Sequence, residues 1–370
     1  MLAVKSSEQM IFDWFQYFHA NPEISWKEVN TTARLAEILS EMGVSIKRFD
    51  DVTGLVAEIG TGKDVIAVRA DIDALWQEVD GVMKANHSCG HDANISMVLG
   101  ALHALKDEVL TKRIRFIFQP AEETGGGALA MIERGVMQDV THLFGVHLRP
   151  QEELPLGKIA PAIYHGAAAF LGGTISGADA HGARPHQGNN AIEVVVAIQQ
   201  MLKNIHIDPF EVYSAKLTKI VADGGSVNII PGNASFSIDV RAQKNEILAQ
   251  VQQYIDRGLK QIAGMFHIDI EWDWQDVTPG AEVSIEAAAV AERAIVESLG
   301  ESYLAPAVVT PGSDDFHFYT IKNPQLKATM IGVGANLEPG LHHPKMTFNA
   351  QALLDGAKAV AATLKMMATK

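Results

Sequence analysis

The stretch DVIAVRADIDAL, residues 64–75, indicates the fold most clearly. Residues 64–70 form an apolar run of strand length that opens directly into acidic residues. The alternation of a strand points Asp71 and Asp73 to the same side. At the carboxyl end of a strand these carboxylates can bind a metal, or hold a metal-binding histidine in place. The alternative is a turn with two solvated aspartates.

Strands and helices alternate on both sides of this stretch. Two further apolar strands are expected at 113–118 and 142–148, among helices at 7–20, 28–43, 93–107 and 127–134. Such alternation predicts a mixed, mostly parallel α/β sheet with helices on both faces. After Pro279 the pattern resumes, with helices expected at 283–299, 313–319 and 350–367 and strands at 304–309 and 327–332.

The middle of the chain has a different pattern of expected strands and helices. Strands are expected at 168–177, 215–222, 234–241 and 267–273, with helices at 189–204 and 245–263. These elements suggest a small α/β sandwich. Since the residues that carry chemistry fall on both sides of it, we expect a domain of residues 166–279 inserted into a catalytic domain of residues 1–165 and 280–370. A length of 370 residues also favours two domains.

Composition excludes some partners and compartments. The net charge of −14, from 30 basic and 44 acidic residues, argues against nucleic acid or an anionic membrane as the main partner. The first residues show no secretory signal and no apolar run is long enough to span a membrane, so we expect a cytoplasmic protein. The single cysteine, Cys89, excludes an intramolecular disulfide.

The neighbours of Cys89 suggest a metal site. In HSCGHDAN, residues 87–94, Cys89 and His91 lie two apart on a glycine-containing turn before a helix. A thiolate and an imidazole on such a turn can reach one ion or a close pair of ions. Asp92 can orient the histidine ring. The alternative is a buried cysteine beside a solvated histidine.

Three other segments place ligand-type side chains at expected strand ends or turns. In FQPAEETGGG, residues 118–127, one of Glu122 and Glu123 can bind a metal while the other accepts a proton from water. His147 ends the strand of GVHLRP, residues 145–150. A His-His-Pro turn in residues 340–349 offers a last ligand, without deciding between its two histidines.

Eight motifs in this order resemble the M20 metallopeptidase family, and specifically its amidohydrolase branch. That branch includes aminoacylase-like enzymes, auxin-conjugate hydrolases, hippurate hydrolases and N-acetyl-diaminopimelate deacetylases. The motifs are RADIDAL (69–75), HSCGHD (87–92), FQPAEETGGGA (118–128), GVHLRP (145–150), GADAHGARPH (177–186), GGSVNIIPG (224–232), PGSDDFHFY (311–319) and LHHPKMTF (341–348).

The resemblance implies roles for individual residues. It makes Glu122 the general base and His181, from the inserted segment, a group that holds the reacting carbonyl. Asn228 and Arg241 would contact the acid end of the substrate, and the inserted segment would be a lid that forms a homodimer. Two divalent ions (Zn, Mn, Co or Ni) would be bound by Cys89, His91, Glu123, His147 and His342.

The sequence departs from the family pattern near the expected pocket. Trp76 replaces the proline of the Leu-Pro pair, Asn94 replaces a usual histidine, and Asp314 replaces a glutamate. The resemblance predicts hydrolysis of the amide bond of an N-acyl amino acid or related conjugate. These departures leave the exact substrate open. The alternatives are an exopeptidase of the same superfamily, a cysteine-nucleophile hydrolase, and a non-catalytic metal- or ligand-binding protein.

Overall fold

A computed structural model describes residues 6–369, which divide into two compact units. The first comprises residues 6–164, Glu282–Val309 and residues 315–369. The second comprises His165–Ala281 and Thr310–Asp314. The second unit thus interrupts the first in the chain, between residues 164 and 282.

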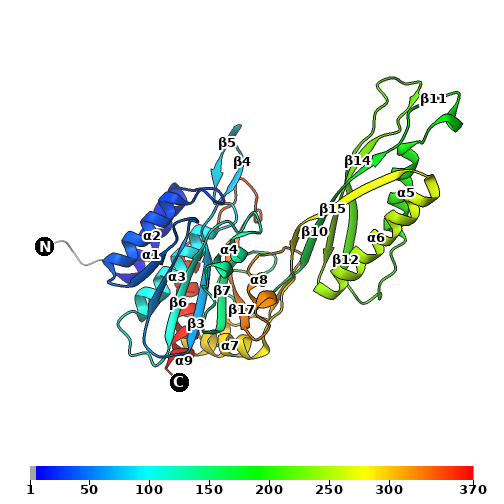
Figure 1. The fold of residues 1–370 in the computed structure, drawn as a ribbon. Helices are drawn as coiled ribbons and strands as arrows, with labels where there is room; N and C mark the ends of the chain where they lie inside the picture. The colour runs from blue at the N-terminus through cyan, green and yellow to red at the C-terminus, as the bar shows by residue number, and fades with distance from the viewer. Residues whose placement is uncertain (1–5, 370) are drawn as a thin grey trace. The chain divides into compact units, whose positions relative to one another are not determined.

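The first unit is built on a seven-stranded sheet (Figure 1). Its four central strands, β6, β3, β7 and β17, run parallel, and the pairs at both edges are antiparallel. All seven residues of β3 are buried, as expected for a strand covered on both faces. In order across the sheet the strands are β1 (Ser45–Arg48), β2 (Leu55–Ile59), β6 (Arg113–Gln119), β3 (Val65–Asp71), β7 (Val140–Pro150), β17 (Lys327–Leu337) and β8 (Ile159–Ala160).

Helices cover both faces of this sheet. Alternate residues of β3 face opposite ways, so Ile66 and Val68 join one apolar core and Ala67 joins another. The larger core packs against α1 (Ser7–Ala20), α2 (Val29–Glu41), α3 (His91–Leu105), α7 (Ile285–Leu299) and α9 (Ala352–Ala368). The smaller core packs against α4 (Gly127–Glu133) and α8 (His317–Lys322).

The second unit is a four-stranded antiparallel sheet with two helices on one side (Figure 1). Burial alternates along β14, where Phe236, Ile238 and Val240 face the helices and the residues between them face away. Across the sheet the strands are β12 (Tyr213–Val221), β14 (Ala234–Ala242), β10 (Ala167–Ser176) and β15 (Asp269–Thr278), and the helices are α5 (Ala191–Lys203) and α6 (Asn245–Phe266).

The predicted mixed α/β fold is confirmed, and the longer elements begin and end within a few residues of their expected bounds. The expected strand at 304–309 shortens to β16 (Val308–Thr310), which pairs with β9 (Ile163–His165). Two two-stranded antiparallel pairs were not predicted: the hairpin of β4 (Leu75–Val79) with β5 (Val82–Asn86), and the pair of β11 (Ala180–His181) with β13 (Ile229–Ile230). Short 3-10 turns complete the fold at Pro185–Gln187 and Glu301–Tyr303.

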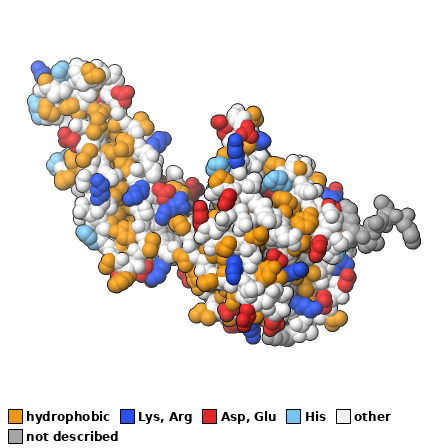
Figure 2. Space-filling view, turned by 180° about the vertical axis from the view of Figure 1, so that it is seen from behind, with side chains coloured by type: hydrophobic (Ala, Val, Ile, Leu, Met, Phe, Trp, Pro, Cys, Tyr) orange, Lys and Arg blue, Asp and Glu red, His pale blue; other side chains and the backbone are white. Residues whose placement is uncertain are grey.

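The described residues contain no helix that is both long and apolar enough to cross a membrane. On the face drawn in Figure 2, acidic and basic side chains of the described residues are interspersed, without a continuous basic tract. This distribution agrees with the acidic net charge, and that face offers no continuous basic surface to which a polyanion such as nucleic acid could bind.

Candidate metal centre

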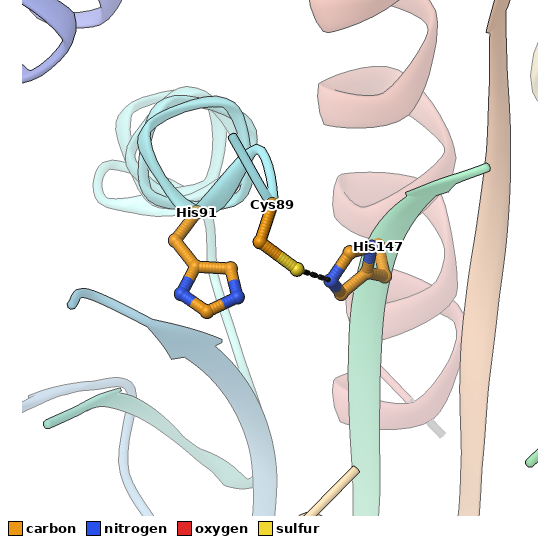
Figure 3. A group of neighbouring side chains, drawn as sticks. All are labelled: Cys89, His91 and His147. Atoms are coloured by element: carbon orange, nitrogen blue, oxygen red, sulfur yellow. Dashed lines mark hydrogen bonds between the residues drawn. The ribbon is translucent and has the colours of Figure 1, made fainter. Parts of the chain in front are cut away.

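The turn before α3 brings Cys89 and His91 to the carboxyl end of the parallel strands. Gly90 takes a left-handed conformation (φ 84°) and caps the helix that begins at His91. Figure 3 shows that the Cys89 side chain points from this turn to His147 at the end of β7. The Cys89 Sγ and His147 Nε2 atoms are 3.6 Å apart, and all three side chains are buried.

Hydrogen bonds fix which nitrogen of each ring can bind a cation. His147 Nδ1 donates to the Leu148 carbonyl at 2.7 Å, and His91 Nδ1 donates to the Asp73 carbonyl at 2.9 Å. Since carbonyl oxygens only accept, both Nδ1 atoms carry a proton, and in the neutral rings that bind a cation both Nε2 atoms offer a lone pair. His91 Nε2 is buried without a hydrogen-bond partner among the described residues.

The loop after β6 places two carboxylates against this cluster. The Glu123 backbone N–H donates to Asp73 Oδ2 at 3.0 Å, which ties the loop to the end of β3. Glu123 Oε1 lies 3.8 Å from His91 Nε2, and its Oε2 lies 3.5 Å from His342 Nε2. Glu122 Oε2 also lies 3.8 Å from His91 Nε2. Glu123 therefore stands between two histidines, with Glu122 to one side.

The loop after β17 contributes His342 and not His343 to this cluster. The His342 backbone N–H donates to the Ser88 carbonyl at 2.7 Å, beside Cys89. Its backbone is left-handed (φ 65°), a conformation that histidine adopts more often than most residues other than glycine. His343 Nδ1 instead accepts from the Lys345 backbone N–H within its own turn.

Two groups of potential ligands share Cys89. The first is Cys89, His91 and His147, and the second is Cys89, Glu123 and His342; within each, the ligand atoms lie within 4.8 Å of one another. Thiolate, imidazole and carboxylate together suit zinc and other first-row divalent ions. Glu123 Oε1 and His91 Nε2 are buried without a hydrogen-bond partner among the described residues, which adds a second indication, because such atoms normally have one. The residues therefore fit a divalent metal centre.

The pKa values of His91 and Cys89 also favour a bound cation. Burial opposes the charge of His91, yet Asp71, Cys89 and Asp73 outweigh it and hold the pKa of His91 well above its usual value. Burial, with the charge of Glu123 nearby, raises the pKa of the Cys89 thiol well above its usual value. Without a cation, the cluster thus keeps protons that a bound ion would displace.

A buried ion-pair network supports the end of β3. The Arg69 guanidinium contacts Asp71, donates to Gln119 at 2.9 Å, and donates to Asp315 at 2.8 Å. Asp315 in turn accepts from the Ala128 backbone N–H at the start of α4. This network joins β3, β6, α4 and the segment before α8 beneath the metal cluster.

Replacing Arg69 with methionine should lower the free energy of unfolding by about 3–5 kcal/mol, because two buried carboxylates lose their cation. Urea unfolding followed by circular dichroism measures the change. Lys327→Met is the control, since the Lys327–Glu286 ion pair is exposed and surface pairs contribute little. Equal stability of wild type and Arg69→Met would contradict a supporting role.

Comparison with known proteins decides the family. Residues 67–366 match the peptidase family M20/M25/M40. The chain belongs to this family. The M20 resemblance predicted from the motifs is therefore confirmed, and the chain is a hydrolase as expected.

Three M20 relatives illustrate the family's range. The chain is 30% identical to N-acetylcysteine deacetylase of Bacillus subtilis, over 95% of each chain. It is 33% identical to an IAA-amino acid hydrolase of Arabidopsis thaliana, over 69% of this chain and 61% of that one. The crystal structure of the Bacillus subtilis YXEP protein, described as a dinuclear metal binding peptidase of the M20 family, superposes with a TM-score of 0.83 at 27% identity and 99% coverage of both chains.

The histidine partners in this M20 chain differ in part from the sequence expectation. Asp73 orients His91, with Asp73 Oδ1 3.1 Å from His91 Nδ1. Asp92 instead contacts His19 of α1 at 2.6 Å, and that hydrogen bond raises the pKa of His19. Asn94, which replaces a usual family histidine, donates to Asp71 Oδ1 at 2.8 Å. No sequence signal marked His19, because it lies in an ordinary amphipathic helix.

The remaining predicted site residues lie in the second unit. His181 and Asn228 are neighbours there, since Gly182 beside His181 donates its backbone N–H to the Asn228 carbonyl at 2.7 Å. Arg241, on β14, pairs with Asp239 at 2.8 Å and stacks over the ring of Phe170. Within this unit the structure thus brings His181 and Asn228 together, and it gives Arg241 a partner of its own.

Proposed function

We propose that this M20 hydrolase is a metal-dependent amidohydrolase that cleaves the amide bond of N-acyl amino acids or related small conjugates. The observation that carries the proposal is the pair of ligand groups sharing Cys89, with Glu122 beside them and outside both. The names of two relatives, a deacetylase of N-acetylcysteine and a hydrolase of IAA–amino acids, support this substrate class.

Two divalent ions, of Zn, Mn, Co or Ni, would be held by Cys89, His91, Glu123, His147 and His342. When bound, such ions lower the pKa of water towards about 7 and polarise the amide carbonyl. Cys89 is the residue common to both groups, so it would be a ligand in either of them.

Glu122 would then move the proton. Its side chain is 11% exposed, so it is largely buried yet reachable by water. It takes a proton from the attacking water and returns it to the nitrogen of the leaving amine, which departs only once protonated. Glu123 is less suited to this task, because its two oxygens face His91 and His342.

His181 is proposed to donate a hydrogen bond to the developing oxyanion. Its Nδ1 accepts from the Ala183 backbone N–H at 3.0 Å, so in the neutral ring Nε2 carries the proton and can donate. Asn228 and Arg241 are proposed to bind the carboxylate of the amino-acid part. Their amide and guanidinium groups are suitable donors for that anion.

A substrate panel tests this function. N-acetyl, N-benzoyl and longer N-acyl amino acids, together with dipeptides, are supplied to protein loaded with each of the four metals. Amino-acid release from the N-acyl compounds is expected. Release from dipeptides alone would favour an exopeptidase, and inertness toward every compound would favour a non-catalytic binding protein.

A cysteine-nucleophile mechanism is disfavoured by the environment of Cys89. Burial raises the pKa of this thiol, whereas catalytic cysteines need a lowered pKa to form the thiolate. A strong chelator separates the mechanisms. It should remove all activity, restored by adding metal back, while a thiol enzyme would keep its rate.

Metal affinity should depend on pH through Glu123. Burial raises the pKa of Glu123 to about 7, so below that pH a proton competes with the metal for the carboxylate. The affinity should therefore strengthen by roughly tenfold or more from pH 6 to pH 8. Chelator competition at the two pH values measures it, and equal affinities would remove Glu123 from the ligand set.

We also propose that the chain forms a homodimer through the second unit. Apolar side chains are exposed on α5 (Ile192, Val196) and on the neighbouring edge strand β12 (Ile220, Val221), each about half exposed. A contiguous exposed apolar patch marks an association surface, and α5 and β12, which carry these side chains, contact each other. Sedimentation velocity should give a dimer for wild type and a monomer for Val196→Lys; a wild-type monomer would refute the assembly.

A further inference from the structure

We propose that Trp26 forms an apolar wall of a subsite for the acyl group of the substrate, next to the metal centre. The proposal rests on the amidohydrolase function above. Asn228 and Arg241 are proposed to bind the carboxylate of the amino-acid part. Trp26 is assigned to the other end of the substrate, the acyl group.

The backbone at Trp26 is unusual. The Lys27 backbone N–H donates to the Ile24 carbonyl at 2.9 Å, so residues 24–27 form a tight turn with Trp26 at its third position. Its φ of 65° is one that this turn position normally reserves for glycine or asparagine. A bulky aromatic residue there is conformationally costly, and such residues concentrate at functional sites.

Contacts on both sides attach this turn to the elements that carry the site. Ser25 Oγ donates to Asp73 Oδ2 at 2.7 Å, the same carboxylate oxygen that receives the Glu123 backbone N–H. Two residues beyond Trp26, the buried Glu28 carboxylate accepts from the Ala121 backbone N–H at 2.8 Å. The Glu23 carbonyl also accepts from the Ala74 N–H. Trp26 is therefore held between the end of β3 and the loop of Glu122 and Glu123.

The indole ring lies on that catalytic loop. A Cβ placed on Gly126 would come within 3.0 Å of Trp26 Cζ2 and 3.8 Å of Cη2. The Gly126 backbone (φ −110°, ψ −14°) suits any residue, so glycine leaves room here for the ring and serves no conformational need. One part of the ring thus packs on the loop, while the side chain stays 42% exposed.

An exposed indole ring held by a tight turn offers an apolar surface for packing. Aromatic faces bind apolar groups, and aromatic ones best, through offset or edge-on packing. The acyl group is the apolar part of the proposed substrate. We infer a preference for bulky or aromatic acyl groups over acetyl.

Trp26→Gly tests the subsite without straining the turn, because glycine adopts φ near 65° freely. In the metal-loaded enzyme, the ratio of kcat/KM for N-benzoyl to N-acetyl amino acids should fall about tenfold. Trp26→Phe should restore part of the ratio. Phe210→Ala is the control, because Phe210 is an aromatic residue that is 93% exposed on the loop between α5 and β12 and lies outside the proposed site residues. Its ratio should stay within twofold of wild type.

Binding separates this inference from the proposed function. Calorimetry measures N-benzoylglycine and N-acetylglycine binding to metal-loaded wild type and Trp26→Gly, each carrying Glu122→Gln to prevent turnover. A benzoyl preference that Trp26→Gly removes supports the subsite, even if wild type hydrolyses no amide. Hydrolysis with a ratio and a binding preference that are unchanged in Trp26→Gly would overturn the subsite and leave the function intact. An equal loss for both acyl groups would also overturn it, as a structural role predicts.

Discussion

Glu122→Gln should lower kcat for N-acyl amino acids by about 10²–10⁴-fold, the range attributed to a positioned general base. Glutamine keeps the size of the side chain and its place beside His91, but it cannot accept a proton from water. The five proposed metal ligands are untouched, so the metal content should stay at the wild-type value.

Two measurements make this prediction specific. Metal analysis of the purified variant shows whether the ions remain, and the rate with saturating substrate shows whether the base is lost. Glu133→Gln, in an exposed carboxylate at the end of α4, is the control and should retain full activity. A near-normal rate for Glu122→Gln would move the base assignment to Glu123.

The sequence predicts the strand ends that build the site because parallel strands leave a strong signal. β3, β6 and β7 are mostly buried, so each is rich in apolar residues, and acidic or histidine residues cluster near or just after its carboxyl end. Asp71, Glu122 and His147 follow from that reading. The convergence of their loops at one edge then follows from the topology.

Tertiary contacts that carry no local pattern could not be predicted. The pairing of Asp92 with His19 joins residues 73 positions apart, and His19 has no signature beyond its helix. From the residues alone the same limit applies to Glu122 and Glu123, whose roles only the family resemblance distinguished, because adjacent carboxylates differ only in the side chains they meet. In the structure Glu123 faces two histidines and Glu122 one.

The residue preferences of tight turns and hairpins also failed to predict two local structures. A turn with φ of 65° is normally recognised by its glycine or asparagine, and here the position is Trp26. The β4–β5 hairpin was missed for a related reason. Its strands are mostly exposed, with no apolar alternation, although the Asp80-Gly81 pair between them is a typical hairpin turn.

Cys89→Ala should have the second large effect, since both ligand groups lose their common member. Even residues that only orient a ligand cost about 10–100-fold in metal affinity or activity when changed, so loss of a shared ligand should cost at least as much. We expect less than half of the wild-type metal content after dialysis, with activity falling in proportion or more.

The alternative for Cys89 is a buried side chain that only fills space, and it predicts a different result. Alanine would then cost some stability but leave metal content and activity unchanged. Ser96→Ala is the control, because Ser96 is buried on α3, the helix that follows Cys89, and its hydroxyl donates to the Asp92 carbonyl. If Cys89→Ala and Ser96→Ala bind equal amounts of metal, the thiolate has no place in the centre. Loss of metal confined to Cys89→Ala would identify the Cys89 thiolate as a metal ligand.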